Sequence, residues 1–177
     1  MKHGKPIVLI GAAALCAALL FSACGKQPTE AAPDYKLAGN EYVDYTFEYP
    51  EAWETVRDDG MIAVKAANEN VSISCTSFEP DKPEMLAQEY WDGYYESFVK
   101  TFGTDPEILE EDETKLGGVP AKYITYQCDL AGETYVFTQV TGVYNGTAYT
   151  LTYTATPDTH ETYKSALTHA VTSFQFK

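Results

Sequence analysis

The segment 133-ETYVFTQVTGVYNGTAYTLTYTA-155 decides the fold, because two alternating strands flank an Asn-Gly pair within it. Asn145-Gly146 accepts the positive φ angles that a two-residue hairpin turn demands. A two-residue loop at this point fixes the register and pairs Val136 with Ala155, Val140 with Leu151 and Gly142 with Tyr149. One face of this hairpin is apolar and the other mixes threonines with apolar residues, so we expect a sheet that is partly covered on its second side.

Further strands are expected before that hairpin, because apolar residues alternate between turn signals there. Asp58-Asp59-Gly60 and Gly117-Gly118 are the turn signals that join two pairs of them. The predicted strands are residues 43–49, 53–57, 61–65, 71–78, 108–115 and 121–129. Short turns between successive strands favour antiparallel pairing.

The first helical segment spans residues 79–102, where apolar and aromatic residues recur at helical spacing. Asp81 and Glu84 form the predicted capping box at its start, and Gly103 is the predicted stop. Gly93 in its middle indicates either a close approach of the helix to the sheet or a notch for a ligand, and we favour the close approach.

A second helical segment begins after Pro157, with Asp158 and Glu161 as its capping box, and its apolar repeat continues to Phe174. We expect this helix to pack on the sheet. The chain is therefore predicted to be α+β, with an antiparallel sheet of about six to eight strands packed with two main helices.

Residues 1–23 are predicted to be a signal peptide, since a basic start precedes an apolar stretch that is short for a membrane span. Phe21-Ser22-Ala23-Cys24 resembles the lipobox of bacterial lipoproteins, although that family most often has Leu in place of Phe21. The resemblance implies that Cys24 becomes the first residue and carries a diacylglyceryl group and a palmitate, which together hold a protein stably on a membrane. The alternative is that Cys24 is one more apolar residue of an uncleaved helix.

This interpretation divides the chain into three parts. Residues 1–23 are removed, residues 24–41 form a lipidated N-terminus and flexible tether, and residues 42–177 form a single globular domain. The domain is then expected on the extracytoplasmic face of the cell membrane.

The charge of the chain argues against nucleic-acid partners. Its formal charge is −14, from 12 basic and 26 acidic residues. Arg57 is the one arginine. A surface this acidic repels phosphate backbones, so we expect no nucleic acid among the partners.

Two cysteines fall within the expected domain, Cys75 and Cys128. Both lie on the more apolar face of a predicted strand. They form either a disulfide, which an extracytoplasmic compartment permits, or two buried free thiols, and we slightly favour the thiols.

The sequence contains no recognisable catalytic or metal-binding set, and we expect neither an enzyme nor a cofactor. His160 and His169 are nine residues apart on the second helix and are expected to be solvated. The acidic run around Glu110 to Glu113 is expected to be a charged strand edge, since alternation splits its side chains between two faces. We therefore predict no metal site.

The aromatic residues of the first helix allow two interpretations. With 14 tyrosines and eight phenylalanines in the chain, aromatic rings are expected to fill the core. The alternative is a recognition groove at the helix edge, built by Trp91, Tyr94 and Tyr95.

Four pieces of the sequence together resemble a known family. They are Tyr45-Thr46-Phe47-Glu48-Tyr49-Pro50 followed by Trp53, Gly117-Gly118-Val119-Pro120-Ala121, Tyr149-Thr150-Leu151-Thr152-Tyr153-Thr154-Ala155, and Ser173-Phe174. Over about residues 43–177 the chain resembles the PsbP-like domains, including the DcrB-like bacterial lipoproteins. The resemblance implies a PsbP-like α/β sandwich and non-enzymatic accessory or partner-binding relatives, and it carries over no catalytic or metal-binding residue.

The sequence thus leads to two functional hypotheses. The first is a membrane-anchored, non-catalytic accessory module that binds an envelope or extracellular protein. The alternative is a lipoprotein that binds a small ligand or a cation.

Overall fold

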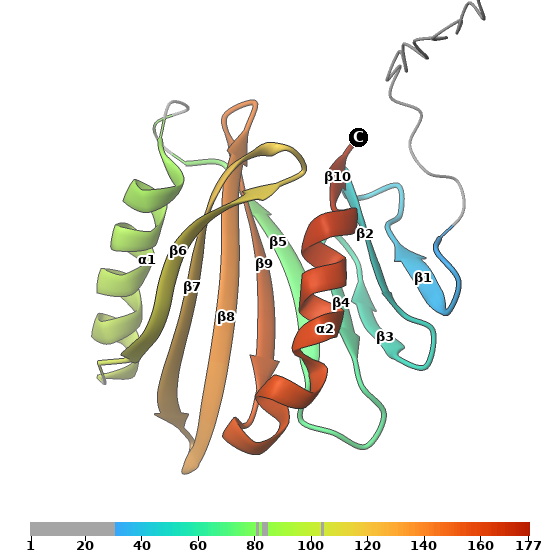
Figure 1. Ribbon diagram of the computed structural model, residues 1–177. Helices are drawn as coiled ribbons and strands as arrows, with labels where there is room; N and C mark the ends of the chain where they lie inside the picture. Colours follow the sequence, from blue (N-terminus) through green and yellow to red (C-terminus); the bar gives the residue numbers. More distant parts are fainter. Residues whose placement is uncertain (1–30, 81, 83–84, 104) are drawn as a thin grey trace, which may run out of the picture.

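The computed structural model describes residues 31–80, 82, 85–103 and 105–177, which form ten strands and two helices (Figure 1). Seven strands form a sheet in the order β3-β4-β5-β9-β8-β7-β6, and three form a smaller sheet in the order β1-β2-β10. This arrangement confirms the predicted α+β class. The bounds are β1 Tyr35–Ala38, β2 Tyr45–Pro50, β3 Glu54–Asp58, β4 Ile62–Lys65, β5 Ser72–Phe78, α1 Ala87–Phe102, β6 Glu107–Leu116, β7 Val119–Leu130, β8 Glu133–Tyr144, β9 Thr147–Ala155, α2 Pro157–Ser173 and β10 Gln175–Phe176.

The β8–β9 hairpin has the predicted register. Val136 pairs with Ala155, Val140 with Leu151 and Gly142 with Tyr149. Asn145 and Gly146 have φ angles of 51° and 82°. Both values are positive, as a two-residue turn of this type requires.

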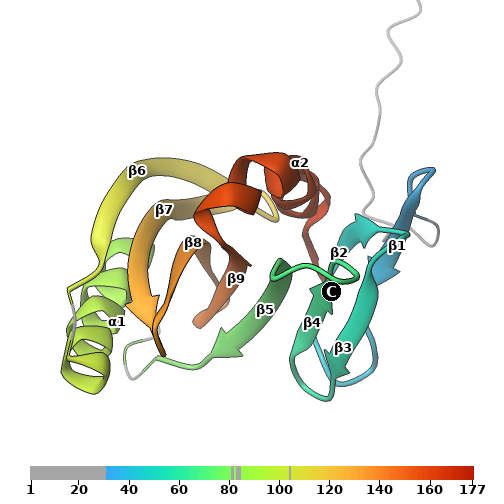
Figure 2. The ribbon, with the colours of Figure 1, turned by 90° about the horizontal axis from the view of Figure 1, so that it is seen from below.

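The two helices lie on opposite faces of the large sheet, with α2 above it and α1 below it in Figure 2. On the α2 face, the core includes Val140 and Leu151 together with residues of β2 such as Tyr45. On the α1 face, a smaller core includes Trp91 and Tyr126. Each helix therefore has its own core, and the sheet separates the two.

The prediction of a flexible tether over residues 24–41 is wrong for residues 35–38. These residues form β1, in which Tyr35 pairs with Pro50 and Ala38 pairs with Phe47 of β2. The Lys36 ammonium also donates to the carbonyl oxygen of Glu51 at 2.7 Å. A strand this short has too little alternation to be recognised from sequence.

Helix α1 begins later than predicted, at Ala87. The predicted cap residues Asp81 and Glu84 lie outside the described residues. The Leu86 backbone N–H instead donates to the carboxylate of Glu89 at 2.8 Å, which satisfies one free donor at the helix start. The predicted stop is confirmed, since Gly103 has a φ angle of 67° and its N–H donates to the carbonyl of Val99.

Helix α2 begins at Pro157 rather than after Asp158, so its predicted capping box is wrong. Thr156 and Thr159 make the cap, because the Thr156 N–H donates to the Thr159 hydroxyl at 3.1 Å. Proline suits the first helical position, where no N–H partner is needed. Glu161 instead contacts the ring of His160.

Gly93 does not mark a close approach of α1 to the sheet. It is exposed, and a Cβ atom added there would meet no described atom within 4 Å beyond the adjacent residues and the backbone of its own helix. The favoured interpretation of this glycine is therefore wrong.

Candidate functional site

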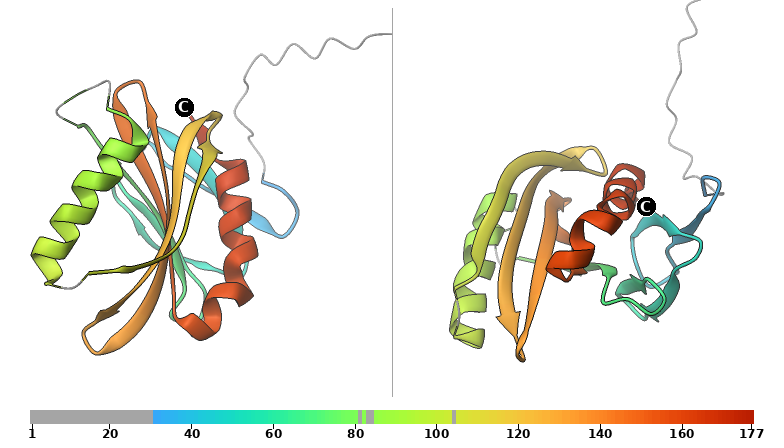
Figure 3. Two further views of the ribbon diagram at one scale, coloured as in Figure 1. Left: turned by 60° about the vertical axis from the view of Figure 1, so that its left-hand side comes forward. Right: turned by 60° about the horizontal axis from the view of Figure 1, so that its bottom comes forward.

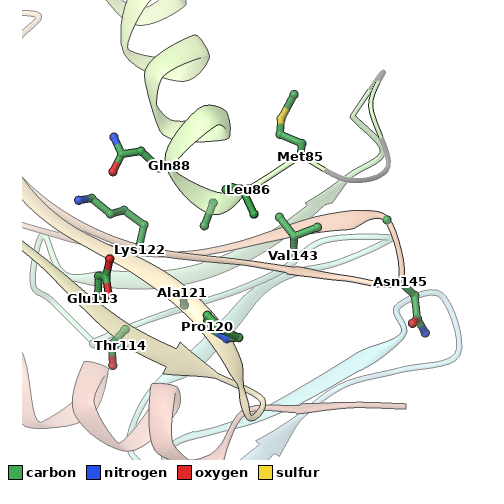
Figure 4. A pocket seen from close by; sticks show the side chains of 12 residues that line it. Met85, Leu86, Gln88, Glu113, Thr114, Pro120, Ala121, Lys122, Val143 and Asn145 are labelled. Carbon is green, nitrogen blue, oxygen red and sulfur yellow. The ribbon is translucent and has the colours of Figure 1, made fainter.

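A hollow of about 500 Å³ lies between the start of α1 and the large sheet (Figure 4). Four segments that are distant in sequence contribute to it, namely the residues around Leu86, strand β6, strand β7 and the β8–β9 turn. Its apolar wall consists of Met85, Leu86, Ala87, Pro120, Ala121 and Val143. Its polar wall includes Gln88, Glu113, Lys122 and Asn145.

Local structure positions the apolar wall of this hollow. Leu86 has an extended backbone just before α1, and its side chain is 66% exposed. Val143 lies two residues before the Asn145-Gly146 turn, which brings it to the same end of the sheet. The hollow is thus open to solvent beside an exposed leucine, an arrangement suited to an apolar group of another molecule.

Lys122, a basic residue of the polar wall, already has an acidic partner. The Lys122 ammonium lies 2.5 Å from the carboxylate of Glu111, and their side chains are 13% and 50% exposed. Among the described residues, Glu113 in the same wall has no cationic partner. The rim of the hollow is therefore acidic in balance.

A second hollow, of about 570 Å³, lies on the other face of β6. It is bounded by the C-terminal part of α2 and by the β6–β7 turn. The lining includes Thr114, Lys115, Gly117, Val171, Thr172 and Phe174. Glu113 and Thr114 line both hollows, so this part of β6 separates them.

The groove predicted from Trp91, Tyr94 and Tyr95 does not include Trp91. The Trp91 side chain is 8% exposed and packs against Tyr126 in the α1 core, so the recognition prediction is wrong for this residue. The Tyr94 hydroxyl lies 3.2 Å from that of Tyr126, and the Tyr95 hydroxyl donates to Asp105 at 3.1 Å. All three residues thus contribute to the packing of α1.

The exposed apolar residues near α1 are different ones. Leu86 is one and Phe78 at the end of β5 is another, and the Phe78 ring lies 6.2 Å from that of Tyr90. The exposure of Leu86 could not be predicted from the sequence, because Leu86 fits the same apolar repeat as the residues that become buried. Leu86 is exposed because α1 begins one residue after it, at Ala87.

Cys75 and Cys128 are buried free thiols, so the disulfide alternative is wrong. They lie on β5 and β7, which are separated by β9 and β8. Their side chains also belong to the two different cores, on opposite faces of the sheet. Burial raises the pKa of both thiols, which disfavours the reactive thiolate.

The two histidines of α2 are not the solvated side chains that were predicted. His160 is buried, and its Nε2 lies 3.2 Å from the Thr138 hydroxyl. His169 is partly buried, and its Nε2 lies 2.7 Å from the carboxylate of Glu48. The nearby Ser173 hydroxyl donates to the backbone oxygen of His169, not to its ring. These contacts hold α2 to the sheets and do not form a Ser-His-acid triad.

No group of metal-ligating side chains occurs within the described residues. The acidic run of β6 is divided as alternation predicts, because Glu113 lies opposite Lys122 whereas Asp112 lies opposite Tyr123. Cys24, the predicted lipidation site, lies outside the described residues. The described part of the chain has no helix with the length and apolarity needed to cross a membrane.

Comparison with known proteins shows the family of the chain. The family model described as PsbP matches residues 39–176. The chain belongs to the PsbP family. The PsbP motifs quoted from the sequence are packing elements, since Tyr45 and Phe47 of β2 are fully buried and a Cβ atom at Gly117 would overlap the ring of Phe176 in β10.

Solved structures share the PsbP fold at low sequence identity. The solution structure of CyanoP from Synechocystis sp. PCC 6803 is 15% identical, with a TM-score of 0.64 over 87% of this chain and 99% of that one. The protein PA94 of unknown function from Pseudomonas aeruginosa, called a putative regulator, is 16% identical, with a TM-score of 0.56 over 77% of this chain and 92% of that one. A variant of the protein Mog1 is 15% identical, with a TM-score of 0.56 over 80% and 95%.

No curated protein matches the chain. At such identities the likeness establishes the PsbP fold, and the fold does not fix the function.

Proposed function

We propose that this PsbP-family protein is a non-catalytic accessory module, held on the extracytoplasmic face of the cell membrane by a diacylglyceryl group on Cys24. Its domain binds an envelope or extracellular protein through the hollow at the start of α1. The PsbP-family fold and the lipobox-like sequence before Cys24 support the proposal. The observation that carries the binding site is the exposed Leu86 beside a solvent-open apolar hollow.

The position of this hollow suits a partner that lies away from the membrane. The described chain begins next to β1, and β1 and α1 lie on opposite sides of the domain in every view (Figure 3). The described chain therefore enters the domain on the side that is remote from the start of α1 (Figure 3). The hollow then faces the extracytoplasmic space.

The non-catalytic part of the proposal rests on the contacts of the reactive groups. His160 and His169 are engaged by Thr138 and by Glu48, and the two thiols are buried. In the described part of the chain, no serine or cysteine lies against a histidine ring that could act as its base.

The second candidate is a small-ligand or cation-binding lipoprotein, which the same hollow favours. Its volume of about 500 Å³ lies within the range of ligand pockets, and Gln88, Lys122 and Asn145 provide polar groups around an apolar wall. A saturable rise in melting temperature with one member of a panel of amino acids, sugars and Ca²⁺ would favour this candidate.

The variant Leu86→Asp tests the docking site. An aspartate there places a charge beside the apolar wall, so a partner that buries Leu86 should be lost from the cross-linked, affinity-captured complex by about tenfold or more. Val56→Asp is the matched control, because Val56 is also exposed, at 52%, on the far edge strand β3. Quantitative mass spectrometry of captured membranes gives the readout, and equal capture by both variants would reject this site.

The variant Cys24→Ala tests the anchor. Without the thiol no acyl chains can be attached, so the variant should carry no diacylglyceryl group and should keep its uncleaved signal segment. Mass spectrometry of the unaltered protein should find a diacylated Cys24 at the N-terminus. An unprocessed N-terminus of the unaltered protein, or processing of the variant at the same position as the unaltered protein, would contradict the anchor.

A further inference from the structure

We infer that the partner docks by adding an extended segment to β6 as an eighth strand of the large sheet, with its apolar side chains toward the first hollow and its basic side chains toward the α2 face. This inference rests on the proposed function and specifies the chemistry of its partner. Strand addition at a free sheet edge is a known mode of peptide recognition, in which backbone hydrogen bonds give affinity and pockets for alternate side chains give specificity.

The first observation is that β6 is a free edge. Among the described strands, it is the last in the order of the large sheet and pairs only with β7. Within the described residues, no backbone hydrogen bond links β6 to any segment outside the sheet, although the Glu113 N–H donates to the carboxylate of the adjacent Asp112 at 2.7 Å. Figure 2 shows β6 at the end of the sheet. The pairing with β7 is irregular between Ile108 and Glu110, so the regular edge runs from Glu110 to Leu116.

The second observation is that a hollow lies on each side of this edge. Glu113 and Thr114 line both hollows, and the register directs Glu113 toward the α1 face and Thr114 toward the α2 face. Successive side chains of an added strand point alternately to these two faces. An added strand beside β6 therefore directs one set of side chains to each hollow, which a helix docked on one face does not do.

The third observation is the charge of the edge. The α2 face of β6 carries Glu110 and Asp112, both exposed, and the chain as a whole has a formal charge of −14. Of the described cations, none pairs with Asp112, and Lys164 lies 3.8 Å from Glu110. Like charges oppose pairing of β6 with a second copy of itself, whereas a strand with lysine or arginine on this face is attracted. On the other face, Glu111 is already paired with Lys122 and Glu113 lies beside the apolar wall of the first hollow, and this wall favours aliphatic residues.

A synthetic peptide tests this inference on the mature, lipid-anchored chain in detergent micelles. The probe is the acetylated and amidated peptide KVRLKVRLK, labelled with fluorescein, in which basic and aliphatic residues alternate. The first control, KVRLPVRLK, has a central proline that removes a backbone donor and disfavours a strand. The second control, EVELEVELE, reverses the charge. Anisotropy measures binding, and hydrogen exchange measures the protection of the β6 amides.

The expected result is saturable binding of KVRLKVRLK, with slower exchange of the amides between Glu110 and Leu116. The proline peptide should bind about tenfold more weakly and the acidic peptide should not bind. The variant Asp112→Lys should weaken binding about fivefold, whereas Glu69→Lys, the same charge change in a remote exposed loop, should have a smaller effect.

Three results would overturn the inference: no saturable binding of the alternating peptide, binding without protection of β6, or equal binding of the proline peptide. Each leaves the proposed function standing if Leu86→Asp still abolishes capture of the partner. If Leu86→Asp does not reduce capture of the partner, the proposed docking site is rejected instead. The two failures are therefore distinguishable.

Discussion

The effect of replacing Gly93 on stability depends on whether it lies on the exposed or the buried face of α1. It lies on the exposed side of α1, and a Cβ atom there would meet no atom of the described part of the chain within 4 Å apart from its neighbours and its own helix backbone. Glycine in a helix interior costs about 1 kcal/mol relative to alanine. We therefore expect Gly93→Ala to raise the free energy of unfolding by about 1 kcal/mol in urea denaturation.

Gly117→Ala is the opposing control for that substitution. Gly117 has a φ angle of 57°, and a Cβ atom there would lie 2.5 Å from the ring of Phe176. The strained backbone and the overlap should lower the free energy of unfolding by about 1–3 kcal/mol. A lower stability of Gly93→Ala would contradict the exposed placement of Gly93.

At the scale of elements, β1 is held by its pairing with β2 and also by contacts with α2. The ring of Tyr35 stacks on that of His169, with centroids 3.6 Å apart, and His169 is 2.7 Å from the carboxylate of Glu48. Glu48 is buried and also accepts a hydrogen bond from the Ala32 N–H at 3.3 Å. The strand that follows the expected tether is thus attached to both β2 and α2.

His169→Phe tests this attachment. The phenylalanine keeps a ring for Tyr35 but removes the contact between the His169 ring nitrogen and the Glu48 carboxylate, which should lower the free energy of unfolding by about 1–3 kcal/mol. Hydrogen exchange should become faster in residues 35–38. The double variant with Glu48→Met should recover part of the loss, because no buried carboxylate then remains. Unchanged exchange of β1 in the single variant would show that this contact does not hold the strand.

Some elements of the fold could be predicted from the sequence and others could not. The β8–β9 register was predictable because Asn145-Gly146 fixes the loop length, and the loop length fixes every pair in the hairpin. The partners of β1 and the burial of His160 depend on contacts between distant segments. The hollow beside Leu86 is of the same kind, since four separate segments form it. Local spacing carries no information about such contacts.

For the molecule as a whole, buried tyrosines make up much of both cores. Tyr45, Tyr149 and Tyr153 lie in the α2 core, and Tyr126 lies in the α1 core. Their hydroxyl groups have partners inside the protein, such as the backbone oxygen of Cys75 for Tyr45 and the carboxylate of Asp44 for Tyr149. The structure therefore accepts these tyrosines only in the neutral form.

This requirement predicts a loss of stability at alkaline pH. Burial raises the pKa of Tyr45, Tyr126, Tyr149 and Tyr153 above the ordinary value of 10.0. Above that value the unfolded chain releases protons that the folded protein retains, so stability is fully present below pH 10.0 and falls as the pH rises further. Urea denaturation between about pH 8 and pH 11.5 should show the decline, with tyrosinate absorbance appearing together with unfolding.

Tyr126→Phe separates the tyrosines from other groups that titrate in the same range. The phenylalanine keeps the ring that packs against Trp91 and Phe98 but removes one group with a raised pKa. The free energy of unfolding of this variant should therefore fall less steeply above pH 10.0 than that of the unaltered protein. Phe137→Leu, which alters a neighbouring ring of the same core without removing a titrating group, should leave the slope unchanged. Equal slopes for Tyr126→Phe and the unaltered protein would show that the α1 core admits an ionised tyrosine, and the core would then have to open to water on the side where the Tyr94 hydroxyl meets that of Tyr126.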